Sequence, residues 1–250
     1  MYLFGGRLVW VLIPFLFLTC KSMAELRSTE TGYGDYRDVD WNTTFYDNVG
    51  MPSKESVKWI TNNKETFLRF RLKDGDIGKA QTDPVKRRNI KYMERAELKA
   101  RNYFKKDSRY DISFSVRFVE GFKGKKEHWF QIHQWLKNCH DQRPPVMLSF
   151  DRSILRMDTL FDDKSREKYK SNIEINELYG KWNEVNIYLD LKDNFISVSF
   201  NENSIFNEKI YVSKCGAPHI KFGIYRGKGS RKNAVSSIDF DKISVEKRIN

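Results

Sequence analysis

Hydrophobic and polar residues alternate in short runs along most of the chain, and this pattern predicts β-strands. From Ile220 to Ile224 every second residue is apolar. Lys221, Gly223 and Tyr225 occupy the positions between and after them. Because side chains of a strand point to opposite faces in turn, one face is apolar enough for a core and the other offers a cation and a phenol. The glycine between them leaves room for a close approach to the backbone.

The same alternation recurs over most of the sequence and defines the fold class. Many short strands with few helices indicate an all-β sandwich or jelly roll, in which one curved sheet can hold a polymer on its concave face. The predicted strands are 57–60, 66–72, 94–101, 110–119, 127–136, 146–150, 153–157, 185–191, 195–200, 219–226 and 238–245.

Two segments allow more than one interpretation. Residues 94–101 consist of good helix formers, yet their strict alternation favours a strand in which Arg95, Glu97, Lys99 and Arg101 share a charged face. Residues 164–177 are highly charged and predict a short helix or a loop.

Residues 127–136 predict a surface suited to sugars. Strict alternation places Trp129, Gln131, His133 and Trp135 on one face. Indole faces stack on the C–H side of pyranose rings, and amide and imidazole groups supply directional hydrogen bonds.

The N-terminus has the pattern of a secretory signal peptide. Arg7 precedes the apolar run Leu8–Leu18, which is too short to span a membrane, and Ser22-Met-Ala24 offers a small-x-small cleavage site. Lipid anchoring through Cys20 is an alternative to cleavage. We therefore predict a signal peptide over residues 1–24 and a single domain over 25–250 in a secreted or periplasmic, monomeric protein.

Charge and cysteine content restrict the partners. The net charge is +12, and removing Arg7 and Lys21 with the signal peptide leaves +10, so an anionic polymer is the expected partner. No nucleic-acid-binding signature occurs, which argues against DNA or RNA. Cys139 and Cys215 could form a disulfide or simply be buried, and their spacing does not suggest a zinc site.

Three of the predicted strands resemble the motifs of the β-jelly-roll polysaccharide lyases. Arg95-Ala-Glu-Leu98 resembles their R-x-E-L strand, Gln131-Ile-His133 their Q-I-H strand, and Lys221-Phe-Gly-Ile-Tyr225 their K-x-G-x-Y strand. Alginate lyases, glucuronan lyases and heparin lyase I share this architecture, and the motifs occur here in the same order. The resemblance implies an all-β, concanavalin A-like β-jelly roll of two antiparallel sheets with a concave substrate cleft. Ile220 before the third motif and Arg226 after it make that motif more similar to the heparin lyase I-like branch.

The resemblance implies cleavage of a uronic-acid-containing polysaccharide by β-elimination. Such an enzyme neutralises the uronate carboxylate, removes the C5 proton with a base and protonates the leaving O4 with an acid. Gln131 and Arg95 are the expected neutralisers, and His133 and Tyr225 the expected base and acid, with the choice between them open. Substrate binding is assigned to Lys221, Arg101, Glu97, Trp129, Trp135, Lys99 and Arg226, and Glu97 is expected to orient an arginine.

This chemistry requires no cofactor. A structural Ca²⁺ is an option at the acidic pairs Asp74/Asp76 and Asp162/Asp163. Two other functions remain open: a non-catalytic carbohydrate-binding protein of the same fold, suggested by the two tryptophans, and a glycoside hydrolase, for which the expected pair of carboxylates on one strand is not found.

Overall fold

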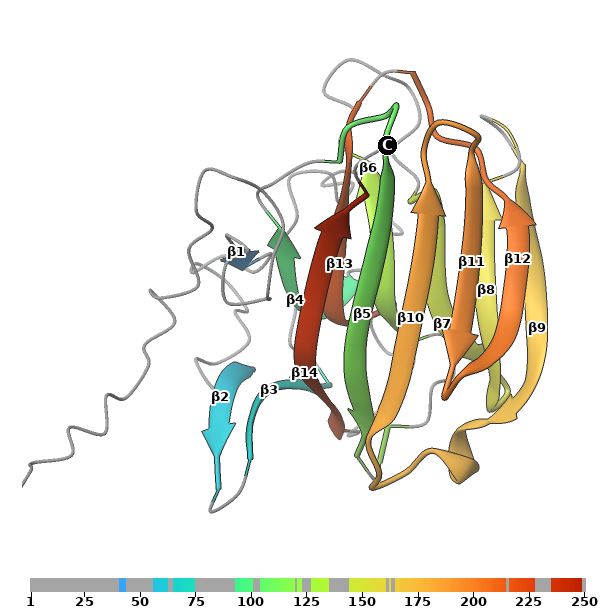
Figure 1. The fold of residues 1–250 in the computed structure, drawn as a ribbon. Coiled ribbons are helices and arrows are strands. Elements are labelled where there is room, and N and C mark those ends of the chain that lie inside the picture. The colour runs from blue at the N-terminus through green and yellow to red at the C-terminus, as the bar shows by residue number, and fades with distance from the viewer. Residues whose placement is uncertain are drawn as a thin grey trace, which may run out of the picture.

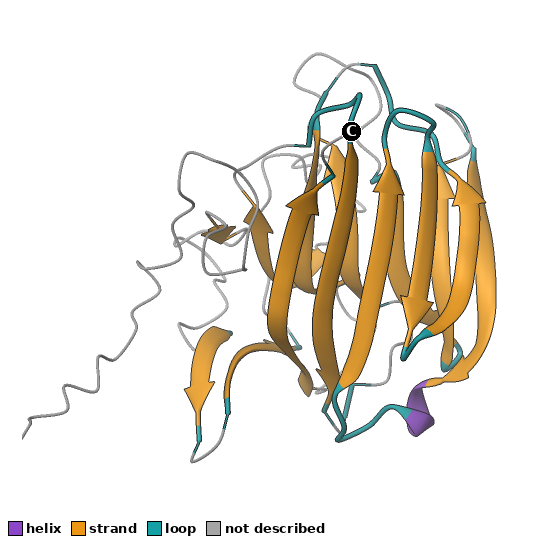
Figure 2. Ribbon diagram, in the orientation of Figure 1, coloured by secondary structure: helices purple, strands orange, loops and turns teal. Residues whose placement is uncertain are grey.

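The structure is a computed structural model that describes twelve segments of the chain. These are residues 41–43, 56–62, 65–74, 93–100, 104–119, 121–122, 127–134, 144–160, 162, 165–214, 216–227 and 235–248. Within them, strands dominate and the single helical element is the 3₁₀ turn η3 (Ile175–Glu177) (Figure 2).

The strands form two seven-stranded sheets that lie one behind the other (Figure 1), and all neighbouring strands are antiparallel. The first sheet has the order β1 (Trp41–Thr43), β4 (Met93–Ala100), β13 (Pro218–Gly227), β6 (His128–Gln134), β7 (Val146–Asp151), β8 (Ile154–Leu160) and β9 (Arg166–Glu174). The second has the order β12 (Asn203–Lys209), β11 (Phe195–Phe200), β10 (Asn183–Asp190), β5 (Arg109–Phe118), β14 (Val235–Lys247), β3 (Thr66–Lys73) and β2 (Val57–Thr61).

The inward faces of the two sheets meet in one aromatic-rich core. Phe114 of β5 is central: its ring centroid lies 4.9 Å from that of Phe222 on β13 and 5.5 Å from that of Phe130 on β6. Every second residue of β5, from Tyr110 to Phe118, is buried, as the alternation predicts. The predicted sandwich of two antiparallel sheets is therefore confirmed.

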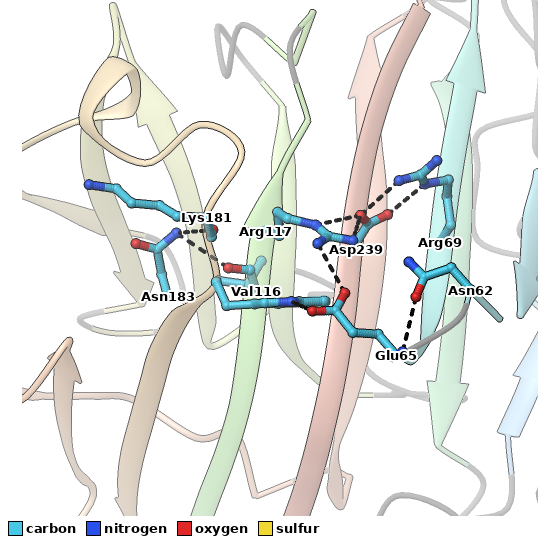
Figure 3. Close-up of polar contacts among 9 residues, drawn as sticks. Asn62, Glu65, Arg69, Val116, Arg117, Lys181, Asn183 and Asp239 are labelled. Carbon is cyan, nitrogen blue, oxygen red and sulfur yellow. Dashed lines mark hydrogen bonds and ion pairs between the residues drawn. The ribbon is translucent and has the colours of Figure 1, made fainter. Parts of the chain in front are cut away.

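An ion-pair network ties three strands together on the outer face of the second sheet (Figure 3). Asp239 of β14 is fully buried and accepts hydrogen bonds from Arg69 of β3 (Nε, 2.7 Å) and Arg117 of β5 (Nε, 3.0 Å). The Arg117 guanidinium also lies 4.5 Å from the Phe67 ring and 4.3 Å from the Trp182 ring. Because two guanidinium groups compensate the buried carboxylate, the network fixes the positions of β3 and β5 on either side of β14.

One edge strand differs from the prediction, and another was not predicted. The prediction of a helix or loop over 164–177 is wrong, because residues 166–174 form β9 at the edge of the first sheet. Asn203–Lys209 forms the unpredicted edge strand β12. Edge strands bury few side chains and carry many charges, so the apolar half of the alternation is nearly absent from them.

In the described segments no helix is long and apolar enough to cross a membrane. The signal peptide predicted over residues 1–24 lies outside these segments. The division into this peptide and a single domain over 25–250 stays a prediction.

Candidate active site

The three motif strands are direct neighbours in the first sheet, in the order β4, β13, β6. Their register places Lys221 opposite Gln131, Tyr225 opposite Arg95, and His219 opposite His133. Residues directly opposite each other on antiparallel strands have Cβ atoms about 5 Å apart. The motifs, which are far apart in sequence, therefore form one cluster on the face of the sheet that points away from the core.

Glu97 connects two of the predicted site residues. Its carboxylate accepts a hydrogen bond from Nη1 of Arg95 (3.2 Å) and another from Nε2 of Gln131 (3.0 Å). All three side chains are nearly buried. The expected contact between Glu97 and an arginine is thus present, and the same carboxylate also fixes the Gln131 amide.

Tyr225 lies between a cation and an imidazole. The Arg95 guanidinium carbon is 4.7 Å from the centre of the Tyr225 ring, which is a cation–π distance. On the other side, the ring centroid of His128 is 5.9 Å from that of Tyr225. A guanidinium so close to the ring attracts negative charge on the phenol oxygen.

A pair of imidazoles, His133 and His219, lies farther along the same face. The ring centroids of His133 and His219 are 5.1 Å apart, and both side chains are almost fully buried. His219 had no assigned role in the sequence, although it shares a face with Lys221 and Tyr225. Cross-strand register, which a single sequence does not contain, is the signal that connects it to His133.

Gly223 allows the backbone of the neighbouring strand β4 to approach closely. Its φ is +131°, and a Cβ placed there would lie 2.1 Å from the carbonyl oxygen of Ala96 and 2.9 Å from Cδ1 of Phe70. Only glycine fits this position, because both the backbone conformation and the space exclude a side chain. The predicted close approach is therefore made by the backbone of β4.

Trp129 is not on the polar face, so the expectation for this residue is wrong. Its side chain is 1% exposed and packs edge-on against Phe114, Phe118 and other core rings. The register of β6 against β7 and β13 shifts between His128 and Phe130, so Trp129 and Phe130 both point inward. An irregularity of one residue inverts all positions beyond it, and it brings His128 to the polar face beside Tyr225.

Arg226 is also misplaced by the sequence interpretation. It is fully buried on the inward side of β13 and donates hydrogen bonds to Glu94 (2.6 Å), Glu127 (2.8 Å) and Ser236 (3.0 Å). Ser236 belongs to the second sheet. Arg226 therefore joins the two sheets and does not face a substrate in this structure.

Some predicted residues lie outside the described segments. These are Arg101, Trp135, the side chain of Lys99, the cysteines Cys139 and Cys215, and Asp76 and Asp163 of the proposed calcium sites. The backbone of Lys99 is placed, opposite Lys221.

The polar face continues from β6 onto β7, β8 and β9. Arg156 of β8 forms an ion pair with Asp158 (Nε to Oδ1, 2.8 Å). Burial is the main cause that lowers the pKa of His128 to about 3, and the nearby positive charges of Arg156 and Arg166 lower it further. His128 is thus a neutral imidazole at ordinary pH. The sequence interpretation did not place Arg156 or Arg166 at the site.

Among the described residues, no group of three or more histidine, cysteine, aspartate or glutamate side chains could hold a metal ion.

The structure is thus a two-sheet β-sandwich that carries an arginine, an amide, imidazoles and a tyrosine on one sheet face. A sequence model of the polysaccharide lyase family matches residues 38–244, which is most of the chain. The chain belongs to the polysaccharide lyase family. It is a polysaccharide lyase.

Solved structures of alginate lyases share the fold. The alginate lyase PA1167 from Pseudomonas aeruginosa is 16% identical with a TM-score of 0.59, and the match covers 83% of this chain and 98% of that chain. Alginate lyase AlgAT5 of polysaccharide lyase family 7 is 14% identical with a TM-score of 0.57, and the match covers 84% of this chain and 95% of that chain. The family 7 alginate lyase A1-II′ in complex with product is 12% identical with a TM-score of 0.56, and the match covers 76% of this chain and 83% of that chain.

At these identities the likeness shows the fold alone, and it confirms the predicted β-jelly roll. No curated protein sequence is similar enough to the chain to count as a match.

Proposed function

We propose that the protein cleaves a uronic-acid-containing anionic polysaccharide by β-elimination at the 4-O glycosidic bond. The observation that carries this proposal is the register of β4, β13 and β6, which places Arg95 opposite Tyr225 and Lys221 opposite Gln131 on one face. Secretion through the N-terminal segment would bring the basic protein to such polymers outside the cell.

The first requirement of the reaction is to neutralise the uronate carboxylate, because the C5 proton becomes acidic only when the adjacent negative charge is compensated. Arg95 and Gln131 are suited to this, since both donate hydrogen bonds and both are held by Glu97. The holding carboxylate fixes these donors before substrate binds, so little reorganisation is needed during the reaction.

The elimination involves two proton transfers and breaks the C5–H and C4–O4 bonds. A base takes the C5 proton, the electrons of the C5–H bond form the C4=C5 double bond, and the C4–O4 bond breaks. O4 leaves with a proton that an acid supplies. Tyr225 is the proposed acid and also the proposed base, because His133 lies opposite His219, six residues or about 20 Å along β13 from Tyr225. The Arg95 guanidinium near the Tyr225 ring would stabilise the phenolate form in either role.

The test is the ultraviolet absorbance of the unsaturated product during incubation with alginate, glucuronan and heparin. We expect Tyr225→Phe to lower the rate about 10³-fold, which corresponds to about 4 kcal/mol in the barrier. Tyr188→Phe is the matched control, because Tyr188 lies on β10 in the other sheet and donates to Asp190.

The absence of unsaturated product from all three polymers with the wild-type protein would refute the uronate proposal. The alternative of a non-catalytic carbohydrate-binding protein predicts polymer binding that persists in Tyr225→Phe. That alternative depended on Trp129 and Trp135, and Trp129 now lies in the core.

A further inference from the structure

A continuous row of polar positions crosses the first sheet from the reaction centre to its far edge. Each position is directly opposite the next on the neighbouring strand. We call these six residues the cross-sheet row: Arg95 (β4), Tyr225 (β13), His128 (β6), Ser149 (β7), Arg156 (β8) and Lys170 (β9). With strands about 4.8 Å apart, the row is about 24 Å long.

Exposure differs along the row: Ser149 is fully buried, whereas His128 and Tyr225 are partly exposed. The Arg95 side chain is 4% exposed, the Arg156 side chain 14% and the Lys170 side chain 58%. The β9 end of the row is therefore accessible to a polymer chain.

Two polar atoms in the middle of the row lack a protein partner within the described part of the chain. Nδ1 of His128 and Oγ of Ser149 are buried and make no hydrogen bond there. Buried polar atoms in proteins nearly always have a partner, so the row is incompletely hydrogen-bonded between Tyr225 and Arg156.

The β8–β9 part of the row is cationic. Arg156 is held by Asp158 through Nε and Nη2, at 2.8 and 3.0 Å, and Lys170 pairs with Asp151 at 2.9 Å. Arg166 is at the start of β9, and the positive charges of Arg156 and Arg166 both reach His128, whose pKa they lower. The charges of Arg156 and Arg166 therefore act at the position beside Tyr225.

We propose that Arg156 is a specificity-determining residue that binds the anionic group of a sugar unit beyond the cleaved linkage, on a polymer that follows the cross-sheet row. Three strand spacings separate β8 from β13, so Arg156 lies about 14 Å from Tyr225, more than the length of one sugar unit. Because Asp158 already orients the guanidinium, binding a carboxylate or sulfate costs little ordering. This inference rests on the proposed function, since the row begins at the same reaction centre.

The experiment compares Arg156→Gln and Arg156→Lys with the wild type on two substrates. One is whichever of alginate, glucuronan and heparin the wild type cleaves fastest, and the other is the shortest oligosaccharide of that polymer that it cleaves. We expect Arg156→Gln to raise KM for the polymer about tenfold with little change in kcat, and to leave the short substrate nearly unaffected. Arg156→Lys should recover part of the loss, because it keeps the charge without the fork.

Two further variants separate binding from folding. Arg248→Gln is the matched control, because Arg248 forms a comparable fork with Asp111 on the outer face of the second sheet (2.6 and 2.8 Å). The double variant Arg156→Gln/Asp158→Asn leaves no buried carboxylate without its cation, so it should fold and still show the raised KM.

Two results would overturn the inference: an equal effect of Arg156→Gln on polymer and short substrate, or no effect on either, as expected for Arg248→Gln. A polymer with carboxylates only, such as alginate, and a sulfated one, such as heparin, distinguish which anionic group is bound. If the wild type forms no unsaturated product from any polymer, the proposed function fails and the same variants are compared by affinity electrophoresis in alginate and heparin gels. Weaker retention of Arg156→Gln alone supports the inference, and unchanged retention overturns it.

Discussion

Gly223 provides the sharpest test of how the site is assembled, because a single methyl group there should separate two of its strands. In Gly223→Ala the new Cβ would lie 2.1 Å from the Ala96 carbonyl oxygen, whereas an ordinary contact is at least 3.4 Å. Relief requires a shift of about 1 Å between β13 and β4, which weakens two or more interstrand hydrogen bonds at about 1 kcal/mol each. The unfavourable φ of +131° adds about 1–2 kcal/mol.

The expected loss of unfolding free energy is therefore about 4 kcal/mol, or a fall in Tm of about 8–16 °C for a chain of this size. Urea unfolding and thermal unfolding followed by circular dichroism measure both quantities. The matched control is Gly180→Ala, because Gly180 also has a positive φ, +72°, but has nothing within 4 Å of the added Cβ. This control should lose only about 1 kcal/mol.

Equal losses in the two variants would refute the argument, because they would show that conformation alone, and not the contact with β4, makes glycine necessary at 223. A Gly223→Ala protein that folds should also lose lyase activity, since the shift would move Tyr225 away from Arg95.

Two further predictions concern residues beside the bulge of β6. Trp129→Ala should lower the unfolding free energy, measured by urea unfolding, by about 3–5 kcal/mol. The folded fraction should keep the polymer affinity of the wild type in affinity electrophoresis. Weaker affinity with unchanged stability would contradict the core placement. His128 has a pKa of about 3 in the folded protein, so between about pH 6.5 and 3 the folded state binds fewer protons at this residue than the unfolded state. The unfolding free energy should therefore fall on acidification through this range, by at most about 5 kcal/mol. His128→Gln should flatten this dependence in urea midpoints at pH 7 and pH 4.5, and an equally steep fall would contradict it.

The sequence was sufficient to predict the strands whose two faces differ strongly in polarity. In β5 and β13 large apolar side chains alternate with polar ones, so both the strand and its inward face followed from the period of two. The motif residues on the polar side of β4 and β13 were placed correctly for the same reason. In β9 and β12 the signal was weak, because an edge strand has little apolar surface to bury.

Errors at the site came from features that local alternation does not encode. The prediction for Trp129 assumed an unbroken period of two, and the bulge broke it. Arg226 was expected on the substrate side because it follows a motif, although its parity already placed it with Ile224 on the inward face. Two acidic partners from distant segments make that burial possible, and neither is recognisable as a partner from sequence spacing.

The charged character of β9 has a consequence for the protein in solution. As the last strand of its sheet, it presents one row of backbone groups that another chain could extend, and the lysines at 168 and 170 oppose this because two such edges repel each other. The same cations lie at the open end of the cross-sheet row. A bound polyanion would therefore cancel the repulsion, so mixtures of the protein with excess acidic polymer should become turbid sooner than either component alone, and enzymatic degradation of the polymer should clear them.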